Sequence, residues 1–171
     1  MNVERTLIIL KPDAIKRGIV GDILTRFEKT GLKIVGTKMI QPDKSQLHYH
    51  YEEISKMISR RGQHAFDLTL EMMQEGPVIV AVLEGVEAVS QVRKMVGTTE
   101  PKEAVPGTIR GDFAHLSFKY ADMEGIGIPN VIHASGSEKE AEKEIKHWFS
   151  DSELFKYQTV SEHYTQPKKR S

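Results

Sequence analysis

The sequence has 171 residues, of which 39% are hydrophobic, 28% are charged and none is cysteine. Its 24 basic and 24 acidic residues cancel, so no overall charge attracts nucleic acid or an anionic membrane, and any anion site must be local. The missing cysteine excludes disulfides, a thiolate nucleophile and cysteine-based zinc sites, and no apolar stretch approaches the roughly 20 residues of a membrane span.

The first half of the chain alternates strand and helix patterns. Residues 5–11 are leucine-rich and β-branched and predict a short buried strand. Residues 12–31 predict an amphipathic helix, because apolar side chains recur at every fourth position and form one face. A second strand is expected at 32–41, followed by two helices at 44–58 and 65–75 in a polar, mixed stretch.

The second half begins with the clearest strand pattern, at 76–85, and continues with an amphipathic helix at 86–97. Residues 98–111 contain prolines and glycines without periodicity and predict a long ordered loop, a kind of segment that tends to carry function. Residues 113–129 are consistent with a small hairpin or another excursion, and their form stays open. NVIHAS at 130–135 predicts the fourth strand.

A last helix is expected at 137–149, where Ser137 and Glu140 have the spacing of a capping box. The element order fits an α/β (α+β) fold with a ferredoxin-like β-α-β-β-α-β core, in which helices cover one face of an antiparallel four-stranded sheet. A helical insert and a C-terminal extension complete it. We expect one domain over residues 1–171 with a frayed tail from about residue 165, and a cytoplasmic location, because no signal peptide is recognisable.

His133 ends the last strand pattern, directly before the last helix. From the local pattern alone such a histidine is an ordinary core or surface residue, so other features must decide its role. The HYH stretch at 48–50 suggests a metal site at first sight, but two histidines two positions apart on a helix point to different sides. We therefore expect no metal site formed by protein ligands.

Five segments, taken in order, resemble the nucleoside diphosphate kinase family. They are ERTLIILKPDAIKRGIVGDILTRFEKTGLKIVG, GPVIVAVLEG, VRKMVGTTEP, PGTIRGDF and NVIHAS. Each is weak alone, but their order along nearly the whole chain makes the resemblance specific. Neither a Walker A motif nor GxGxxG occurs, so the phosphate cradle of P-loop proteins or protein kinases is not indicated.

The resemblance implies a nucleoside diphosphate kinase, which transfers the γ-phosphoryl group of a nucleoside triphosphate to a nucleoside diphosphate. It implies a ping-pong reaction in which His133 takes the phosphoryl group and passes it on. ATP, GTP and other nucleotides are the expected substrates. Mg²⁺ is the expected cofactor, carried on the nucleotide phosphates.

The resemblance also implies roles for residues beside the nucleophile. Glu144 matches the glutamate that orients the histidine ring, and Ser135 matches a serine that hydrogen-bonds near the transferring group. Tyr51 matches a tyrosine close to the catalytic histidine.

Phosphate and sugar contacts follow from the same resemblance. Lys11, Arg93 and Arg110 fall on phosphate-binding positions, where their charges would stabilise the transferring group. Thr99 matches a hydroxyl that contacts phosphate, and Asn130 matches a residue that bonds the sugar.

The chain departs from the family pattern in the base slot and after the nucleophile. The family usually stacks the base on a phenylalanine where this chain has Ala65, so Phe66 or His64 takes over, or the base is held more loosely. Of these, Phe66 is the candidate for nucleotide binding. The family commonly has aspartate at Gly136, which puts that carboxylate's part in positioning metal-bound water in doubt. Extra residues at 117–129 leave the other wall of the base slot unassigned.

The resemblance further implies a homo-oligomer, with a homohexamer favoured over a homotetramer because of the long loop and the C-terminal extension. Two other functions compete with the enzyme. A regulatory nucleotide-binding module would have kept the fold and lost turnover, as Ala65 and Gly136 suggest. A ferredoxin-like RNA-binding domain would need exposed aromatic residues on its strands, whereas the predicted strands are aliphatic. The nucleophile and the cations favour the enzyme, and no nucleic acid or membrane partner is expected.

Overall fold

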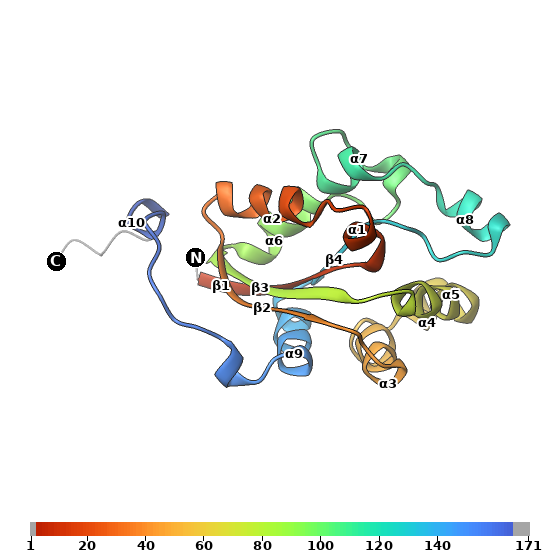
Figure 1. Cartoon of the computed structure of the whole chain (residues 1–171), viewed down its shortest axis with the longest axis horizontal. Coiled ribbons are helices and arrows are strands. Elements are labelled where there is room, and N and C mark those ends of the chain that lie inside the picture. The colour runs from red at the N-terminus through yellow and green to blue at the C-terminus, as the bar shows by residue number, and fades with distance from the viewer. Residues whose placement is uncertain (1–2, 166–171) are drawn as a thin grey trace.

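The computed structural model describes residues 3–165 and contains a four-stranded antiparallel sheet with the strand order β2-β3-β1-β4 (Figure 1). The strands are β1 (Val3–Leu10), β2 (Lys33–Ile40), β3 (Val78–Val86) and β4 (Ile132–Ala134). β1 and β3 form the centre, and the short β4 pairs with the last residues of β1. The predicted ferredoxin-like α+β fold is therefore confirmed.

Helices cover both faces of the sheet, so the prediction that they cover one face is wrong (Figure 1). α2 (Val20–Lys29) and α6 (Ala88–Val96) pack on one face, and α5 (Gln63–Gln74) and α9 (Glu138–Trp148) pack on the other. The reason lies in the strands. Consecutive residues 7–10 of β1 are all fully buried, so this strand presents apolar side chains in both directions and each face needs a cover.

The other helical segments are short, and two of the predicted helices are divided by a residue in the left-handed region of φ. The remaining helical segments are α1 (Pro12–Lys16), α3 (Lys44–His48), the π-helical η1 (Tyr49–Ile54), α4 (Met57–Arg61), the turn η2 (Pro101–Glu103), α7 (Ile109–Phe113), α8 (Phe118–Glu124), the turn η3 (Asp151–Glu153) and α10 (Glu162–Thr165). Gly18, with a φ of 69°, separates α1 from α2, and Lys56, with a φ of 52°, separates η1 from α4. A left-handed residue ends the helical hydrogen-bond ladder, which apolar periodicity does not reveal.

Residues 113–129, whose form the sequence left open, contain a helix and not a hairpin. The Ser117 hydroxyl accepts a hydrogen bond from the Tyr120 N–H (3.1 Å) and begins α8, and Gly125, with a φ of 63°, ends it. The segment then returns across α5. A Cβ at Gly127 would lie 2.6 Å from the Leu68 carbonyl oxygen, so only glycine allows this close approach.

The chain beyond α9 is the predicted C-terminal extension. It packs along β2, which is an edge strand of the sheet. The Phe155 N–H donates to the Val35 carbonyl (2.7 Å), and Lys33 forms an ion pair with Glu162 (2.6 Å). Most of the expected frayed tail, residues 166–171, lies outside the described residues. Within residues 3–165, none of the helices combines the length and apolar character that crossing a membrane requires.

Candidate active site

His133 lies in β4 opposite Ile9, after a strained residue. Val131 has a φ of 61°, a left-handed conformation that a β-branched residue rarely adopts. Its N–H donates to the Asp13 carboxylate (3.1 Å), and its carbonyl accepts from the Lys11 N–H (3.0 Å). Strain that neighbouring hydrogen bonds hold in place is concentrated at functional sites.

A buried carboxylate holds the ring of His133. Glu144 on α9 is fully buried, with Oε1 2.8 Å from His133 Nε2, while its Oε2 accepts a hydrogen bond from the Ser135 hydroxyl (2.5 Å). Burial raises the pKa of Glu144, but the neighbouring His133 and the two hydrogen bonds lower it by a larger amount. The resulting pKa is about 2. Because the ionised carboxylate only accepts, His133 donates from Nε2, and its Nδ1 keeps a free lone pair.

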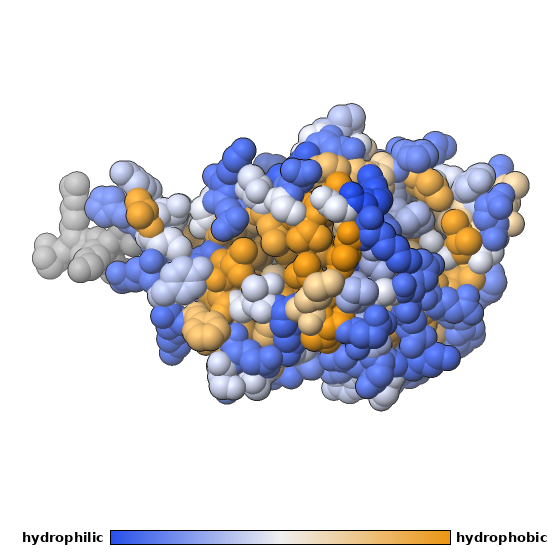
Figure 2. Space-filling model, in the orientation of Figure 1, coloured by the Kyte–Doolittle hydropathy of each residue, from blue (hydrophilic) through white to orange (hydrophobic). Residues whose placement is uncertain are grey.

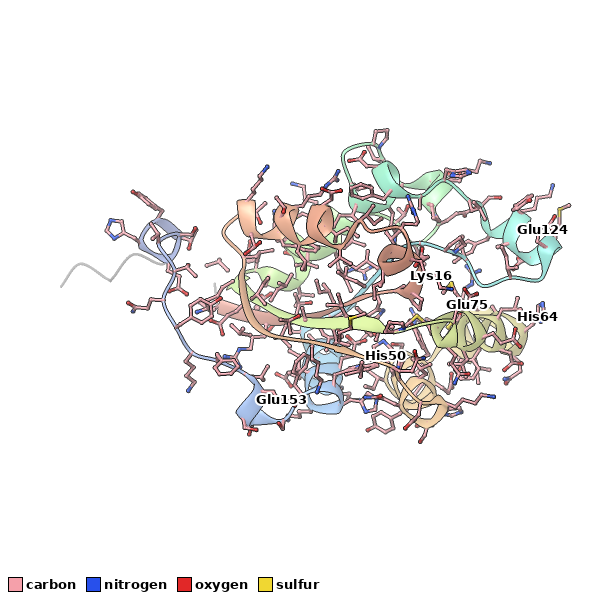
Figure 3. All side chains as sticks on the ribbon, viewed as in Figure 1. Lys16, His50, His64, Glu75, Glu124 and Glu153 are labelled. Carbon is pink, nitrogen blue, oxygen red and sulfur yellow. The ribbon has the colours of Figure 1, made fainter. Side chains whose placement is uncertain are left out.

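Sequence reasoning missed His50 as part of this network. His50 lies in the interior on the α9 side of the sheet (Figure 3), fully buried, with its ring edge-to-face against His133 at a centroid distance of 4.5 Å. The Trp148 indole N–H donates to His50 Nδ1 (3.1 Å), so the proton of the neutral ring is on Nε2, 3.7 Å from Glu144 Oε1. Burial and the neighbouring His133 lower the pKa of His50, which favours this neutral form.

This tautomer bears on metal binding. His50, His133 and Glu144 bring potential ligand atoms within 4.8 Å of one another. A metal on His50 Nε2 would require the proton on Nδ1, where the Trp148 N–H already donates. The Trp148 hydrogen bond therefore disfavours a metal ion on His50, and of the three side chains only His133 and Glu144 are hydrogen-bonded to each other.

His133 opens onto a cavity of about 270 Å³ that contains most of the predicted binding residues. The cavity lining includes Lys11, Tyr51, Arg93, Thr99, Arg110 and Asn130. Hydrogen bonds connect several of them: Lys11 Nζ donates to Asn130 Oδ1 (2.6 Å), and Asn130 Nδ2 donates to the Thr99 carbonyl (2.9 Å). Lys11 directly after β1, residues of η1, α6 and α7, and two loop residues thus meet beside the histidine.

Two of the cations are buried, and one is held by backbone carbonyls. The Arg110 guanidinium donates to the carbonyls of Gly97 (3.0 Å) and Ile132 (2.6 Å), which orients it. Burial lowers the pKa of Arg110 to about 10 and that of Lys11 to about 8, while Asp13 partly opposes the shift at Lys11. Buried cations of this kind favour an anionic ligand, because the ligand replaces the solvation that they have lost.

Tyr51 also faces the cavity, as its predicted role requires. Its ring lies edge-on to His133 at a centroid distance of 6.2 Å, and its hydroxyl is buried without a hydrogen-bond partner among the described residues. Burial raises the pKa of Tyr51, so the hydroxyl stays protonated and can donate.

The structure does not bring Phe66 to the cavity. Phe66 is 2% exposed in the hydrophobic core, where it packs edge-on to His48. Ala65 does line the cavity, whereas His64 is exposed at the outer end of α5 (Figure 3). Phe118 in α8 is instead an aromatic residue of the lining, and no sequence periodicity marked it.

A second carboxylate occupies the space beside Gly136. Glu140 lines the cavity and accepts a hydrogen bond from the Gly136 N–H (2.9 Å). A Cβ at Gly136 would overlap Glu140 Oε2, so a side chain at that position and this placement of Glu140 exclude each other. Only half of the predicted capping box is therefore made: Ser137 accepts from the Glu140 N–H (3.2 Å), but the Glu140 side chain bonds to Gly136.

Comparison with known proteins gives a consistent result. The sequence model of the nucleoside diphosphate kinase family matches residues 4–154. The nucleoside diphosphate kinase of Borreliella burgdorferi is 45% identical over 168 residues, covering 96% of this chain and 99% of that protein. The nucleoside diphosphate kinase of Pyrococcus furiosus is 46% identical, covering 99% of this chain and 97% of that protein.

A solved structure agrees with these sequence matches. It is a transition-state mimic of the Borrelia burgdorferi nucleoside diphosphate kinase with bound vanadate and ADP. It matches with a TM-score of 0.92 at 43% identity and covers 95% of this chain and 96% of that chain. A shared ferredoxin-like core alone would not produce sequence identity over nearly the whole length. This chain therefore belongs to the nucleoside diphosphate kinase family, whose members are phosphotransferases.

Proposed function

We propose that this chain is an active nucleoside diphosphate kinase in which His133 carries the phosphoryl group between two nucleotides. The observation that carries the proposal is the 2.8 Å hydrogen bond between His133 and Glu144, because it leaves Nδ1 as the free nucleophilic nitrogen. A nucleotide-binding module without turnover would have no need for a fully buried carboxylate behind this histidine.

The reaction has two balanced steps. In the first, His133 Nδ1 attacks the γ-phosphorus of the triphosphate, the bond to the β–γ bridging oxygen breaks, and the diphosphate leaves with that electron pair. In the second, a terminal phosphate oxygen of the incoming diphosphate attacks the phosphohistidine, and the electrons of the P–N bond return to Nδ1. The Nε2 proton stays in the hydrogen bond to Glu144, whose charge stabilises the phosphorylated ring, while Ser135 holds the second carboxylate oxygen.

Lys11, Arg93 and Arg110 bind the phosphates and balance the charge of the transferring group. Their position in the lining of one cavity with His133 supports this role. Arg110 is held by backbone carbonyls, so its guanidinium reorganises little when the transition state forms.

Thr99, Asn130 and Tyr51 complete the site. The Thr99 hydroxyl contacts phosphate, and the Asn130 side chain bonds the sugar while it positions Lys11. The unpartnered hydroxyl of Tyr51 donates to the transferring group or to its attacking oxygen.

Catalysis in this family uses a divalent metal ion, and we propose Mg²⁺ for this chain. Among the described residues of the lining, the carboxylates are Asp122 and Glu140, beside several cations. Such a donor set fits Mg²⁺ that is held mainly by substrate phosphates and water. When bound, the ion neutralises charge on the phosphate oxygens.

Initial-rate kinetics test the proposed function. With ATP and GDP varied together, double-reciprocal plots should give parallel lines, because ADP leaves before GDP binds. His133→Ala should have no activity, and His163→Ala, which removes an exposed histidine of α10, should keep the full rate. Intersecting lines, or turnover by His133→Ala, would contradict the phosphohistidine route.

We further propose a homo-oligomer, with a homohexamer favoured, that acts on the cytoplasmic nucleotide pool. Exposed apolar side chains support assembly: Val105, Phe155 and Val160 are 67%, 64% and 84% exposed in the isolated chain. Figure 2 shows further apolar residues gathered over the middle of the face that carries β2 and β3.

A further inference from the structure

The cavity has an apolar part that two distant segments form together. α4 and α5 contribute Met57 and Leu68, and the segment 113–129 contributes Phe118 and Ile126. In Figure 1 these segments lie at the same end of the molecule, with α8 above and α4 and α5 below. A nucleotide joins an anionic phosphate chain to a flat base with apolar faces, so the basic and apolar parts of the cavity match its two ends.

An arginine stacks on an aromatic ring in this apolar part. Cζ of Arg61, the last residue of α4, lies 3.5 Å from the ring centroid of Phe118, the first residue of α8. A guanidinium is planar and stacks on an aromatic face as a nucleobase does. The Arg61 side chain therefore covers the ring face that a base would use.

Other aromatic side chains do not offer such a face. Among the described residues that line the cavity, Tyr51 packs against His133 and belongs to the reacting end. Phe66 is enclosed in the core, and His64 is absent from the lining. Phe118 is thus the aromatic ring that the base can reach.

The two partners differ in how they are held. The Phe118 N–H donates to the Glu100 carboxylate (2.9 Å), which anchors the start of α8. Arg61 belongs to a five-residue helix between Lys56 and Gly62, whose φ angles are 52° and 85°. The start of α8 is therefore anchored by a side-chain hydrogen bond, whereas α4 is a short helix between two residues of positive φ.

We propose that Phe118 is the stacking platform for the nucleotide base and that the Arg61 guanidinium covers the other face of the base. This inference rests on the proposed function, since it takes nucleotides as the ligands. Every base has a π-face, so the arrangement accepts all bases and favours the larger purines. The segment 113–129 thereby supplies the aromatic contact that Ala65 does not.

Calorimetry on the full chain tests the stacking by comparing ADP with inorganic tripolyphosphate, both with Mg²⁺. Phe118→Leu keeps an apolar side chain and removes the ring. Its Kd for ADP should rise about 5- to 100-fold, while its Kd for tripolyphosphate, which has no base, stays unchanged. Arg61→Lys keeps the charge and removes the plane, so it should show the same selective loss to a smaller degree. Tyr120→Leu removes a 51% exposed ring of α8 outside the lining and should change neither Kd.

The comparison separates this inference from the proposed function. If Phe118→Leu raised the Kd for ADP and for tripolyphosphate equally, or changed neither Kd, the stacking role would be overturned. A stacking residue must affect only the ligand that has a base. Failure of the wild-type protein to bind ADP would overturn the proposed function, and this inference with it. A Phe118→Trp variant keeps an aromatic ring and should bind ADP about as tightly as the wild type does. Tight binding by this variant and weak binding by Phe118→Leu would show that the ring, and not a general loss of fold, sets the affinity.

Discussion

Buried charges with fixed partners define the site at the scale of single residues. Glu144 has both carboxylate oxygens hydrogen-bonded, and Arg110 donates to backbone carbonyls. Burial of a charge costs free energy unless such partners compensate it, so each group is confined to one orientation. The chemistry therefore depends on the partners of the reacting residues as much as on the residues themselves.

Glu144, the hydrogen-bond partner of the proposed nucleophile His133, gives the first prediction. Glu144→Gln removes the charge behind His133 but keeps a side chain that can hydrogen-bond, so the rate of phosphorylation by ATP should fall about 10- to 100-fold. Rapid-quench single turnover measures this rate. Glu142→Gln, on the exposed face of the same helix, is the matched control and should phosphorylate at the wild-type rate. Equal rates in both variants would show that the Glu144 charge does not support the reaction.

The pH dependence of binding gives the second prediction. Burial lowers the pKa of Lys11 to about 8, so the free protein loses this positive charge as the pH rises above 8. The Kd for ADP should about double between pH 7 and 8 and then rise by up to about tenfold per pH unit. Lys11→Met should bind more weakly throughout and without this alkaline change. A wild-type Kd that stays flat to pH 9.5 would contradict a depressed pKa.

The elements that carry the reacting residues are predictable from short-range pattern. β1 and β3 are apolar runs bounded by polar residues, and Ser137 begins α9 with the hydrogen bond that its type and position predict. Lys11 and His133 lie at or next to strand ends, where such runs give way to polar residues. Local sequence therefore places Lys11 and His133, the proposed phosphate-binding lysine and the proposed nucleophile, on the fold, although it does not reveal their roles.

Other parts of the site depend on contacts that no local pattern contains. His50 meets Trp148 across 98 residues of sequence, and the direction of that hydrogen bond determines the tautomer of the His50 ring. Phe118 reaches the cavity because Gly127 lets its segment lie against α5, a packing that neither periodicity nor composition expresses. The prediction for Phe66 followed sequence adjacency to Ala65, but successive residues on a helix face different directions, and Phe66 faces the core.

The packing of this segment gives the third prediction. Gly127→Ala places a Cβ against the Leu68 carbonyl and Met72, so it should lower the free energy of unfolding by about 1–3 kcal/mol. Gly21→Ala in α2 has open space around the new methyl group and should raise it by about 0.5–1 kcal/mol. Urea denaturation of both variants gives the comparison. A Gly127→Ala variant as stable as the wild type, or more stable, would show that the contact with α5 is not tight.

The whole molecule has zero net charge but a local cluster of cations. Nucleotide binding therefore depends on cationic side chains that meet at one cavity and not on a long-range electric field. Three of its strongly exposed apolar residues lie outside the lining of the cavity: Val105 in the loop 98–111, and Phe155 and Val160 on the chain beyond α9. Association through such surfaces would leave the catalytic groups within each chain.

The oligomeric state gives the fourth prediction. Light scattering coupled to size exclusion, at micromolar concentration, should give six times the chain mass of 19.4 kDa. Val160→Asp, which puts a charge on an 84% exposed apolar position, should reduce this mass if the chain beyond α9 takes part in assembly. A wild-type mass of a single chain would contradict the homo-oligomer.

The most direct measurement of the central claim is the site of phosphorylation. The wild-type protein is incubated with γ-labelled ATP and Mg²⁺, digested at alkaline pH, and the phosphorylated residue and ring nitrogen are identified by mass spectrometry and NMR. Because Nε2 of His133 is committed to Glu144, we predict one acid-labile, base-stable phosphate on Nδ1 of His133. Phosphate on Nε2, on another residue, or in an acid-stable form would contradict the account.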